Sequence, residues 1–382
     1  MPEEKANNGL HLPDLVIRGF RGIKDLSIPK LGRVTLLAGK NSVGKTTLLE
    51  ALSIFASRGR YSILSSVLAR HDEMSKLLDE DDIEIETPNI IALFHGWDVT
   101  RNTSIVIGPS EKAGQLRIEK TFLTDKQLQL PGLEMLELFG DGEFQSFKVS
   151  YRDKEHMLPW FDVSQGTEGA NFKNPRLHRN MRRALIKSDM PMEIKCETLG
   201  PSLLETNRIA RFWDGIALTD GEEHAVDALR LIFGNKVERI ALTAEEFKQH
   251  GRRIIVKLKG RSHPVPLKSL GDGAVRLFSV ALTLTNVKDG ILLIDEAENG
   301  IHHSIQPDFW RMVLRMAREN NIQVLATTHS WDCVRGFAQA AADDQDAEGV
   351  LYRLERDDED IWAVFYPEDQ LKIAAEQGTE VR

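Results

Sequence analysis

The stretch Val34–Leu52, which reads VTLLAGKNSVGKTTLLEAL, decides the fold. Its first five residues are apolar and predict a buried strand, while the apolar spacing after Thr46 predicts a helix. Between them, Gly39–Thr46 follows the pattern G-x-x-x-x-G-K-[ST], the Walker A motif. A glycine-rich loop there lets backbone N–H groups wrap a phosphate, and the helix N-terminus adds the positive end of its dipole. The stretch therefore predicts a P-loop in an α/β fold.

The side chains of this loop predict how a nucleotide is held. Lys45 can reach the β- and γ-phosphates, and the Thr46 hydroxyl can ligate Mg²⁺. An inert glycine-rich turn is the alternative, but chance yields the four fixed positions in only about one per cent of chains this long. The predicted nucleotide-binding residues are Gly39, Lys40, Asn41, Ser42, Val43, Gly44, Lys45, Thr46 and Thr47.

A second motif far downstream supplies the acidic groups that the loop lacks. Gly290–Asn299 reads GILLIDEAEN, in which four apolar residues predict a core strand that ends in Asp295 and Glu296. Acidic residues at the carboxyl end of a parallel strand face the ligand crevice. We expect Asp295, as Walker B, to hold Mg²⁺ through its water shell. Glu296 is the candidate general base that polarises the attacking water.

Two further features complete a possible site. A strand predicted over Ile322–Ala326 runs into Thr327-Thr328-His329-Ser330, where His329 could approach the γ-phosphate or could be a capping or core-edge histidine. The segment Ser269–Arg276 is a glycine-rich turn before an apolar helix. Such a turn presents free N–H groups to an anion, and a plain loop-to-helix N-cap is the alternative.

The order of these motifs resembles the ABC-type ATPase class, and in detail its SMC, RecF and OLD (overcoming lysogenization defect) branch. Leu15–Lys24 (LVIRGFRGIK) resembles the start of that branch. Ile294–His303 (IDEAENGIHH) and Gln323–Ser330 (QVLATTHS) resemble the OLD-like ATPase heads of phage-defence systems. The likeness covers roughly residues 12–57 and 265–340.

This resemblance implies several roles. Ser269, Gly271, Asp272 and Gly273 would act as the signature of a partner subunit and contact ATP across a dimer interface. His329 would be the switch histidine, and the loop at 298–303 would pair across the same interface. Arg21, in the FRG motif, would form the base-side wall, and the nucleotide would be ATP.

Two departures from the family pattern matter. Where the usual signature is close to LSGGQ, Leu270 is followed here by Gly271-Asp272-Gly273-Ala274, and the expected serine is absent, although Ser269 is adjacent. OLD proteins also carry a C-terminal Toprim nuclease. The 52 residues after Ser330 (382 minus 330) are too few for a domain of typical size. We therefore expect no fused nuclease.

The predicted architecture is a P-loop ABC-type ATPase head with a mixed central sheet, flanking helices and an inserted α+β region. The expected parts are 10–57 with Walker A, 58–264 as the insertion and remaining lobe, and 265–382 with the signature, Walker B and His329. Residues 58–88 and 202–234 have a helical pattern, and the strands expected between them are Ile90–Trp97, Ser104–Ile107 and Leu116–Phe122. No sustained heptads occur, which excludes a long coiled-coil arm.

Composition and charge narrow the remaining classes. No signal peptide and no apolar run near the roughly 18 residues of a membrane span is present. The two cysteines, Cys196 and Cys333, are far apart, which favours a reduced cytoplasmic protein. The net charge of −9 does not favour nucleic-acid binding. Two basic clusters, 176–187 and 252–261, could contact DNA or could simply be solvated.

The sequence therefore predicts an ATP-binding and ATP-hydrolysing switch that works as a homodimer or higher even oligomer with Mg²⁺. We expect it to control a separate effector, such as a nuclease or toxin, in anti-phage defence. A RecF-like DNA-repair ATPase that clamps DNA is the alternative. The altered signature also leaves room for a scaffold that binds ATP without turnover, although Glu296 favours hydrolysis. The signature and the long insertion argue against a transporter ATPase.

Overall fold

The computed structural model describes residues 9–78, 84–97, 99, 103–123, 144–159, 193–243, 252–344 and 348–367. A six-stranded sheet forms its centre, in the order β10-β14-β15-β3-β16-β17. The first five strands are parallel, and the edge strand β17 runs antiparallel to β16. The strands are β10 (Cys196–Leu199), β14 (Ile291–Ile294), β15 (Gln323–Thr328), β3 (Val34–Ala38), β16 (Gly349–Asp357) and β17 (Asp360–Tyr366).

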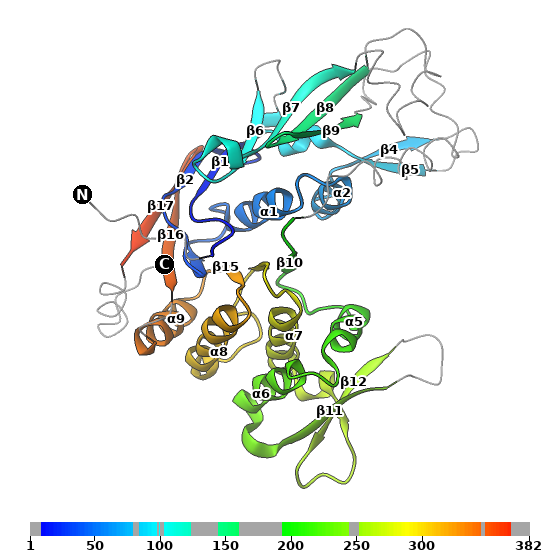
Figure 1. Ribbon diagram of the computed structural model, residues 1–382, viewed down its shortest axis with the longest axis vertical. Helices are drawn as coiled ribbons and strands as arrows, with labels where there is room; N and C mark the ends of the chain where they lie inside the picture. Colours follow the sequence, from blue (N-terminus) through cyan, green and yellow to red (C-terminus); the bar gives the residue numbers. More distant parts are fainter. Residues whose placement is uncertain are drawn as a thin grey trace.

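A second six-stranded sheet is antiparallel throughout and lies on the other side of the P-loop helix (Figure 1). Its order is β2-β1-β6-β7-β8-β9. The strands are β1 (Leu15–Phe20), β2 (Ile23–Ile28), β6 (Ser104–Gly108), β7 (Leu116–Leu123), β8 (Phe144–Tyr151) and β9 (Lys154–Pro159). Helices α1 (Lys45–Ala56) and α2 (Tyr61–Ala69) accompany it. The P-loop helix is thus enclosed between two sheets.

The opposite face of the central sheet is covered by a helical layer (Figure 1). It contains α5 (Thr206–Ile216), α6 (Gly221–Phe233), α7 (Asp272–Asn286), α8 (Gln306–Glu319) and α9 (Trp331–Asp343). Beyond α6 lies a small sheet of β11 (Val237–Thr243), β12 (Arg253–Leu258) and β13 (Val265–Pro266). A separate hairpin pairs β4 (Met74–Leu78) with β5 (Glu84–Pro88).

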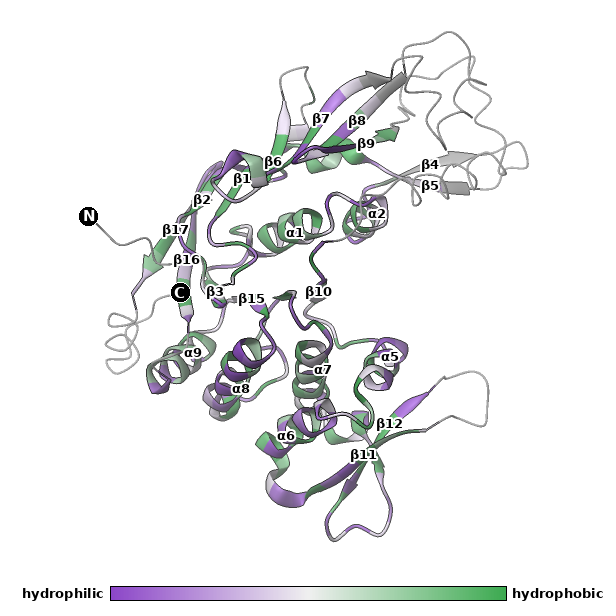
Figure 2. Cartoon of the chain, viewed as in Figure 1, coloured by the Kyte–Doolittle hydropathy of each residue, from purple (hydrophilic) through white to green (hydrophobic). Residues whose placement is uncertain are grey.

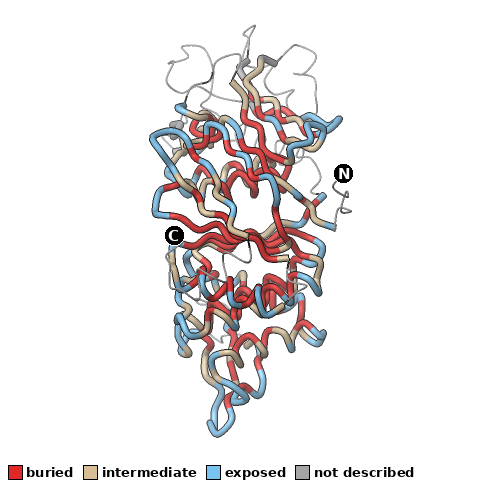
Figure 3. The backbone as a smooth tube through the Cα atoms, turned by 90° about the vertical axis from the view of Figure 1, so that its left-hand side faces the viewer, coloured by how far each residue is buried: buried red, intermediate tan, exposed pale blue. Residues whose placement is uncertain are grey.

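Alternation along the central strands produces two hydrophobic cores. Leu36 and Leu292 pack into the helical layer, whereas their neighbours Leu37 and Leu293 pack against α1 and the antiparallel sheet. The strands are therefore apolar on both faces, as parallel strands between two layers must be. Figure 2 shows the apolar colouring of α1, which packs on this sheet, and Figure 3 shows the strands as a buried band across the molecule. This burial fixes the carboxyl ends of β3, β14 and β15 side by side.

The structure confirms the predicted fold class and the strand–loop–helix of Val34–Leu52, which forms β3 and α1. The predicted strands at Ile291–Ile294, Ile322–Ala326, Ser104–Ile107 and Leu116–Phe122 form β14, β15, β6 and β7. The helical pattern of 202–234 corresponds to α5 and α6. The local spacing of apolar residues was therefore sufficient to predict these strands and helices.

Two local predictions are wrong. The helix expected over 58–88 ends after α2, because Asp72 takes a left-handed φ of 56°, and β4 and β5 follow as a hairpin. The apolar run Ile90–Trp97 does not form a strand but two short 3-10 helices, Ile90–Leu93 and His95–Trp97, with Gly96 at a positive φ of 65°. A short apolar run fits either structure, and periodicity alone does not distinguish them.

Sheet pairing crosses the boundaries expected between the parts of the chain. From the range 58–264, strands β6–β9 extend the sheet begun by β1 and β2, and β10 forms an edge of the central sheet. Helices α5 and α6 contribute to the same core as α7. Much of that range is thus built into the head. No helix among the described residues is long and apolar enough to cross a membrane.

Candidate nucleotide site

The P-loop leaves β3 and enters α1 in a conformation suited to an anion. Gly44 caps α1 with a φ of 97°, a backbone conformation that favours glycine. No side chain caps this end, and the first turn of α1 contains no acidic residue. The first N–H groups of the helix therefore have no internal acceptor and add to the positive end of the helix dipole. This geometry can bind a phosphate.

Lys45 is buried at the first position of α1. Its Nζ donates hydrogen bonds to the carbonyl oxygens of Gly39 and Lys40, both at 2.7 Å. Burial lowers the pKa of Lys45, and the nearby carboxylates of Glu298, Asp295 and Glu296 act in the opposite direction. The ammonium is thus held within the loop that would surround the phosphates.

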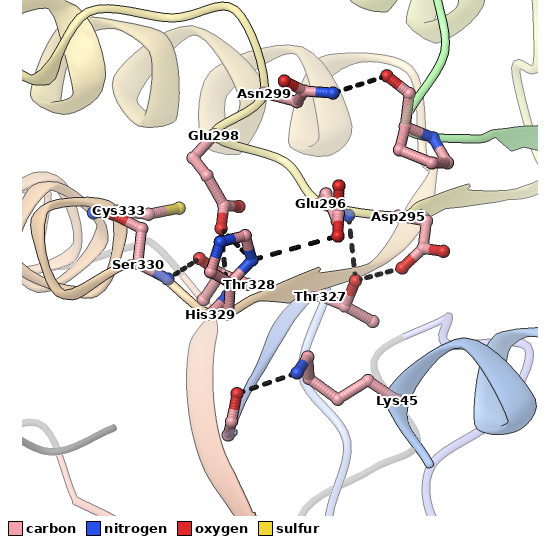
Figure 4. A network of polar contacts seen from close by, with 12 residues as sticks. Lys45, Asp295, Glu296, Glu298, Asn299, Thr327, Thr328, His329, Ser330 and Cys333 are labelled. Carbon is pink, nitrogen blue, oxygen red and sulfur yellow. Dashed lines mark hydrogen bonds and ion pairs between the residues drawn. The ribbon is translucent and has the colours of Figure 1, made fainter. Parts of the chain in front are cut away.

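Walker B meets Walker A through a pair of threonines, and Figure 4 shows one of them, Thr327, beside Asp295. The Thr46 hydroxyl donates to Asp295 Oδ2 at 2.9 Å. On the other side, the Thr327 hydroxyl at the end of β15 donates to Asp295 Oδ1 at 2.5 Å and accepts the backbone N–H of Glu296 at 3.0 Å. Helix α1 and strand β15 therefore fix the carboxylate of Asp295, which follows β14, at the mouth of the loop.

The oxygen atoms at this junction suit Mg²⁺, which prefers carboxylate and hydroxyl ligands completed by water and phosphates. Thr46 and Asp295 are the residues that would hold it, as the sequence predicts. The described part of the chain contains no cluster of three or more His, Cys, Asp or Glu side chains that could hold a metal alone. Two protein ligands would leave positions for water and for phosphate oxygens around the ion.

His329 and the carboxylates after β14 form one polar group (Figure 4). Glu298 Oε1 accepts the backbone N–H of His329 at 2.9 Å and lies 3.1 Å from its Nδ1. Glu296 Oε1 lies 3.9 Å from the same Nδ1. The residue that caps α9 is Ser330, whose hydroxyl accepts from Cys333 N at 3.4 Å. His329 is thus free of the capping role and is oriented by Glu298.

The hollow above the P-loop has a volume of about 270 Å³. It unites residues that are more than 300 positions apart in the sequence. Its lining residues are Gly22, Ile23, Asn41, Ser42, Gly44, Lys45, Thr46, Thr47, Asp295, Glu296, Arg356 and Ile361. The structure therefore brings Asp295 and Glu296 together with most of the predicted P-loop residues, whereas Gly39, Lys40, Val43 and His329 do not line this space.

The signature residues lie elsewhere on the chain. Ser269 lies in the 3-10 helix Leu267–Leu270, and Gly271, at a φ of 96°, caps α7, which begins at Asp272. These three residues are exposed, and none of them lines the hollow above the P-loop. A Cβ on Gly273 would come within 2.6 Å of the Gly300 carbonyl oxygen, so this turn packs closely on the loop after Walker B.

Arg276 connects the signature helix to Walker B, a contact that the sequence analysis missed. Its side chain is only 2% exposed. The guanidinium donates to the carbonyl oxygens of Gly200 at 2.6 Å, Asp295 at 2.8 Å and Glu296 at 3.1 Å. Burial lowers the pKa of Arg276, and the carboxylates of Asp295, Glu298 and Glu296 raise it. Arg276 therefore holds the backbone that carries the candidate base.

We expect Arg276→Met to destabilise the protein by about 3 kcal/mol, because it leaves buried carbonyl oxygens without their charged donor. Chemical denaturation followed by circular dichroism measures this change. The control is Arg18→Met, since the Arg18 side chain is 52% exposed and pairs with Asp25 on the surface. Its expected effect is within about 0.5 kcal/mol. Equal losses in the two variants would contradict the role given to Arg276.

The geometry does not support Arg21 as the base-side wall. Its guanidinium donates to Glu73 at 2.7 and 3.1 Å and lies 3.4 Å from Glu50, which also contacts His71. Arg21 does not line the hollow, whereas the next residue, Gly22, does. The guanidinium of Arg21 is thus already paired with two carboxylates, those of Glu50 and Glu73. The FRG motif gives no indication of these two partners. Arg21 instead ties the β1–β2 turn to α1.

Two stretches of the chain match family models. Residues 12–137, which contain the P-loop, match the model "AAA ATPase domain". Residues 224–332, which contain the signature turn and Walker B, match "AAA domain, putative AbiEii toxin, Type IV TA system". The protein is an ATPase. Both matched stretches contribute residues to the hollow described above.

The chain is similar to several proteins of known sequence or structure. An ATP/GTP phosphatase of Helicobacter pylori is 21% identical over 358 residues, which cover 90% of this ATPase and 92% of that protein. An uncharacterized protein of Methanocaldococcus jannaschii is 34% identical over 92 residues, covering 24% and 80%. Among solved structures, an SMC head bound to the C-winged helix domain of ScpA has a TM-score of 0.48 at 12% identity, covering 94% of this chain and 98% of that chain. The SMC head domain from Thermotoga maritima has a TM-score of 0.44 at 13% identity, covering 94% and 100%.

Proposed function

We propose that this ATPase is a dimeric switch that closes around ATP and thereby controls a separate partner protein. The observation that carries the proposal is the position of the signature turn. Gly271 and Asp272 are exposed and lie outside the hollow of their own chain, yet they pack through Gly273 on the loop after Walker B. A second copy could thus supply this turn to the open side of the nucleotide.

The residues around the hollow support hydrolysis as well as binding. The free N–H groups of the P-loop and Lys45 would hold the phosphates, and Thr46 with Asp295 would hold Mg²⁺, which supplies charge neutralisation during phosphoryl transfer. Water would attack the γ-phosphorus as the bond to ADP breaks, and Glu296 would accept the proton from that water. His329, held by Glu298, would stabilise charge on the γ-phosphate.

Contacts between Walker B and the signature helix α7 support a coupling between the bound nucleotide and the conformation of the signature turn. Arg276 bonds the carbonyl oxygens of Asp295 and Glu296 from α7, and Gly273 touches Gly300. A change at the γ-phosphate that moves Glu296 would therefore reach the exposed signature turn directly. A switch of this kind needs two arrangements of a bistable element whose balance the ligand shifts.

Two observations support a proposal for the nature of the partner, namely the resemblance to OLD-like heads and one family description. The model that matches residues 224–332 is described with a toxin–antitoxin system. We therefore propose a nuclease or toxin that acts in anti-phage defence as the controlled effector. The relative named ATP/GTP phosphatase supports nucleotide hydrolysis as the step that resets the switch.

Contact with DNA has less support. The basic cluster at 176–187 lies outside the described residues. In the other cluster, the Arg252 guanidinium forms two hydrogen bonds with Asp214, at 2.5 and 2.8 Å, which partly neutralises it. A phosphate-binding surface needs several free cations. The RecF-like alternative, in which the protein clamps DNA, predicts that DNA or recombination proteins copurify with it.

Purification of Glu296→Gln from its native host with ATP and Mg²⁺, followed by mass spectrometry, tests the proposal. We expect a stoichiometric effector that is absent from a Lys45→Ala preparation, because only the first variant can hold the closed state. Recovery of DNA or recombination proteins would instead support a repair function. An effector that copurifies equally with both variants would contradict control by ATP.

A further inference from the structure

One wall of the hollow above the P-loop is not explained by any motif in the sequence. Gly22 and Ile23 come from the β1–β2 turn, and Arg356 and Ile361 come from the β16–β17 hairpin. The P-loop and Asp295 occupy the phosphate end of the same space. The wall therefore faces the part of the nucleotide that the phosphate-binding residues do not reach.

The β16–β17 hairpin is fixed against the P-loop by close contacts. Strand β16 pairs with β3 as far as Arg353 opposite Ala38. Beyond that pair, a Cβ on Gly39 would lie 2.8 Å from the Leu354 carbonyl oxygen, and one on Gly44 would lie 3.1 Å from Ile361 Cδ1. The backbone contact at Gly39 excludes a larger residue there, and the φ of 97° at Gly44 favours glycine. The position of Arg356 relative to the P-loop is thus set by packing on both sides.

The guanidinium of Arg356 is anchored at one atom only. Its Nε donates to the Asp358 carbonyl oxygen at 2.7 Å, and it forms no ion pair with a described residue. One terminal nitrogen lies 3.7 Å from the position that a Cβ on Gly22 would take. Arg21 and Arg353 are different, because carboxylates of Glu73 and Glu355 bind them. Arg356 therefore presents an unpaired planar cation at the hollow.

Charge around the hairpin tip distinguishes between two ligands for this cation. Residues 357–360 read DDED, so four carboxylates follow Arg356 directly, and all of them are exposed. A phosphate brought to this tip would meet net negative charge. An uncharged aromatic base avoids that repulsion and stacks favourably on a guanidinium plane. The absence of a side chain on Gly22 lets the guanidinium lie close to the β1–β2 turn at the edge of the hollow.

We propose that Arg356 is the nucleoside-contacting residue of this ATPase, on whose guanidinium the purine base of the bound nucleotide stacks. It takes the place that the sequence assigned to Arg21. Stacking uses the face of the ring and not its edge substituents, so ATP and GTP gain equally from it. The proposal rests on the P-loop hollow being the nucleotide site of the proposed function.

Isothermal titration calorimetry of Arg356→Ala tests this role by measuring its affinities for ATP, GTP and inorganic tripolyphosphate. We expect ATP and GTP to bind about tenfold more weakly, the loss expected for a cation on an aromatic ring. Tripolyphosphate, which has no base, should bind as it does to the wild type. Arg356→Lys keeps the charge but lacks the planar group, so it should lose ATP affinity to a similar extent. Arg18→Ala, outside the hollow, is the control with unchanged affinities.

Two outcomes would overturn the proposal. An equal loss for ATP and tripolyphosphate would show that Arg356 contacts phosphate, and unchanged ATP affinity would show that it contacts neither group. A thermal melt of each variant checks that the fold is retained, as expected for an exposed side chain. If instead the hollow were not the nucleotide site, Lys45→Ala would still bind ATP. This result distinguishes an error in the site assignment from an error in the role of Arg356.

Discussion

Lys45→Ala is expected to remove nucleotide binding almost completely, with ATP affinity falling by about 100-fold or more. Lys45 Nζ sits within the P-loop and bonds the carbonyl oxygens of Gly39 and Lys40 at 2.7 Å. Removing it deletes one cation and its charge-assisted hydrogen bonds to the phosphates, each worth about 1.5–3 kcal/mol. Titration with ATP at constant Mg²⁺ and salt measures the change.

The matched control for this experiment is Lys259→Ala, which removes an exposed lysine from the turn after β12. It alters net charge by the same amount but lies outside the lining of the hollow. Binding should remain within about twofold of the wild type, because surface charges far from a site are screened. Similar losses in both variants would indicate a general effect of charge and would count against a P-loop role for Lys45.

Glu296→Gln is expected to lower ATP turnover by about 100- to 1000-fold, which is typical when a general base is removed. The change keeps the shape of the side chain and should retain ATP affinity within about threefold. The backbone of Glu296 is fixed by hydrogen bonds, because its N–H donates to the Thr327 hydroxyl and its carbonyl oxygen accepts from Arg276. Its side chain is 40% exposed and lines the hollow. Release of phosphate under saturating ATP gives the turnover of each variant.

Two further variants show whether the effect belongs to Glu296. Glu319→Gln, at the exposed end of α8, should turn over ATP like the wild type. Glu298→Gln tests the neighbouring carboxylate, which lies 3.1 Å from His329 Nδ1. If Glu296→Gln retained full turnover while Glu298→Gln lost it, the base would be Glu298 and the assignment made from the sequence would be wrong.

Local pattern predicted the parts of the site that lie on one strand, loop and helix. The P-loop and Asp295-Glu296 are contiguous in the sequence, and their strands are buried on both faces, so apolar runs reveal them. Part of the helical layer could also be predicted, since α5 and α6 repeat apolar residues at helical spacing. The mixed sheet was expected from the resemblance to ABC-type ATPase heads and not from local pattern.

Contacts between distant segments were beyond this kind of prediction. Thr327 reaches Asp295 across 32 positions, Arg276 reaches Gly200 across 76, and Gln323 bonds Leu12 across 311. A single sequence contains no signal for such partners, because only the folded sheet brings them together. For the same reason, the sequence did not reveal that Arg21 pairs with Glu50 and Glu73. The four-residue strand β10 is too short to show alternation.

The mass of Glu296→Gln in solution, measured by analytical ultracentrifugation with and without ATP and Mg²⁺, tests the central claim most directly. We predict a monomer of 43.1 kDa without nucleotide and a species of twice that mass with ATP. The change should be absent in Lys45→Ala and in a double variant that also carries Asp272→Arg in the exposed signature turn. A mass that is the same with and without ATP would contradict an ATP-driven dimeric switch.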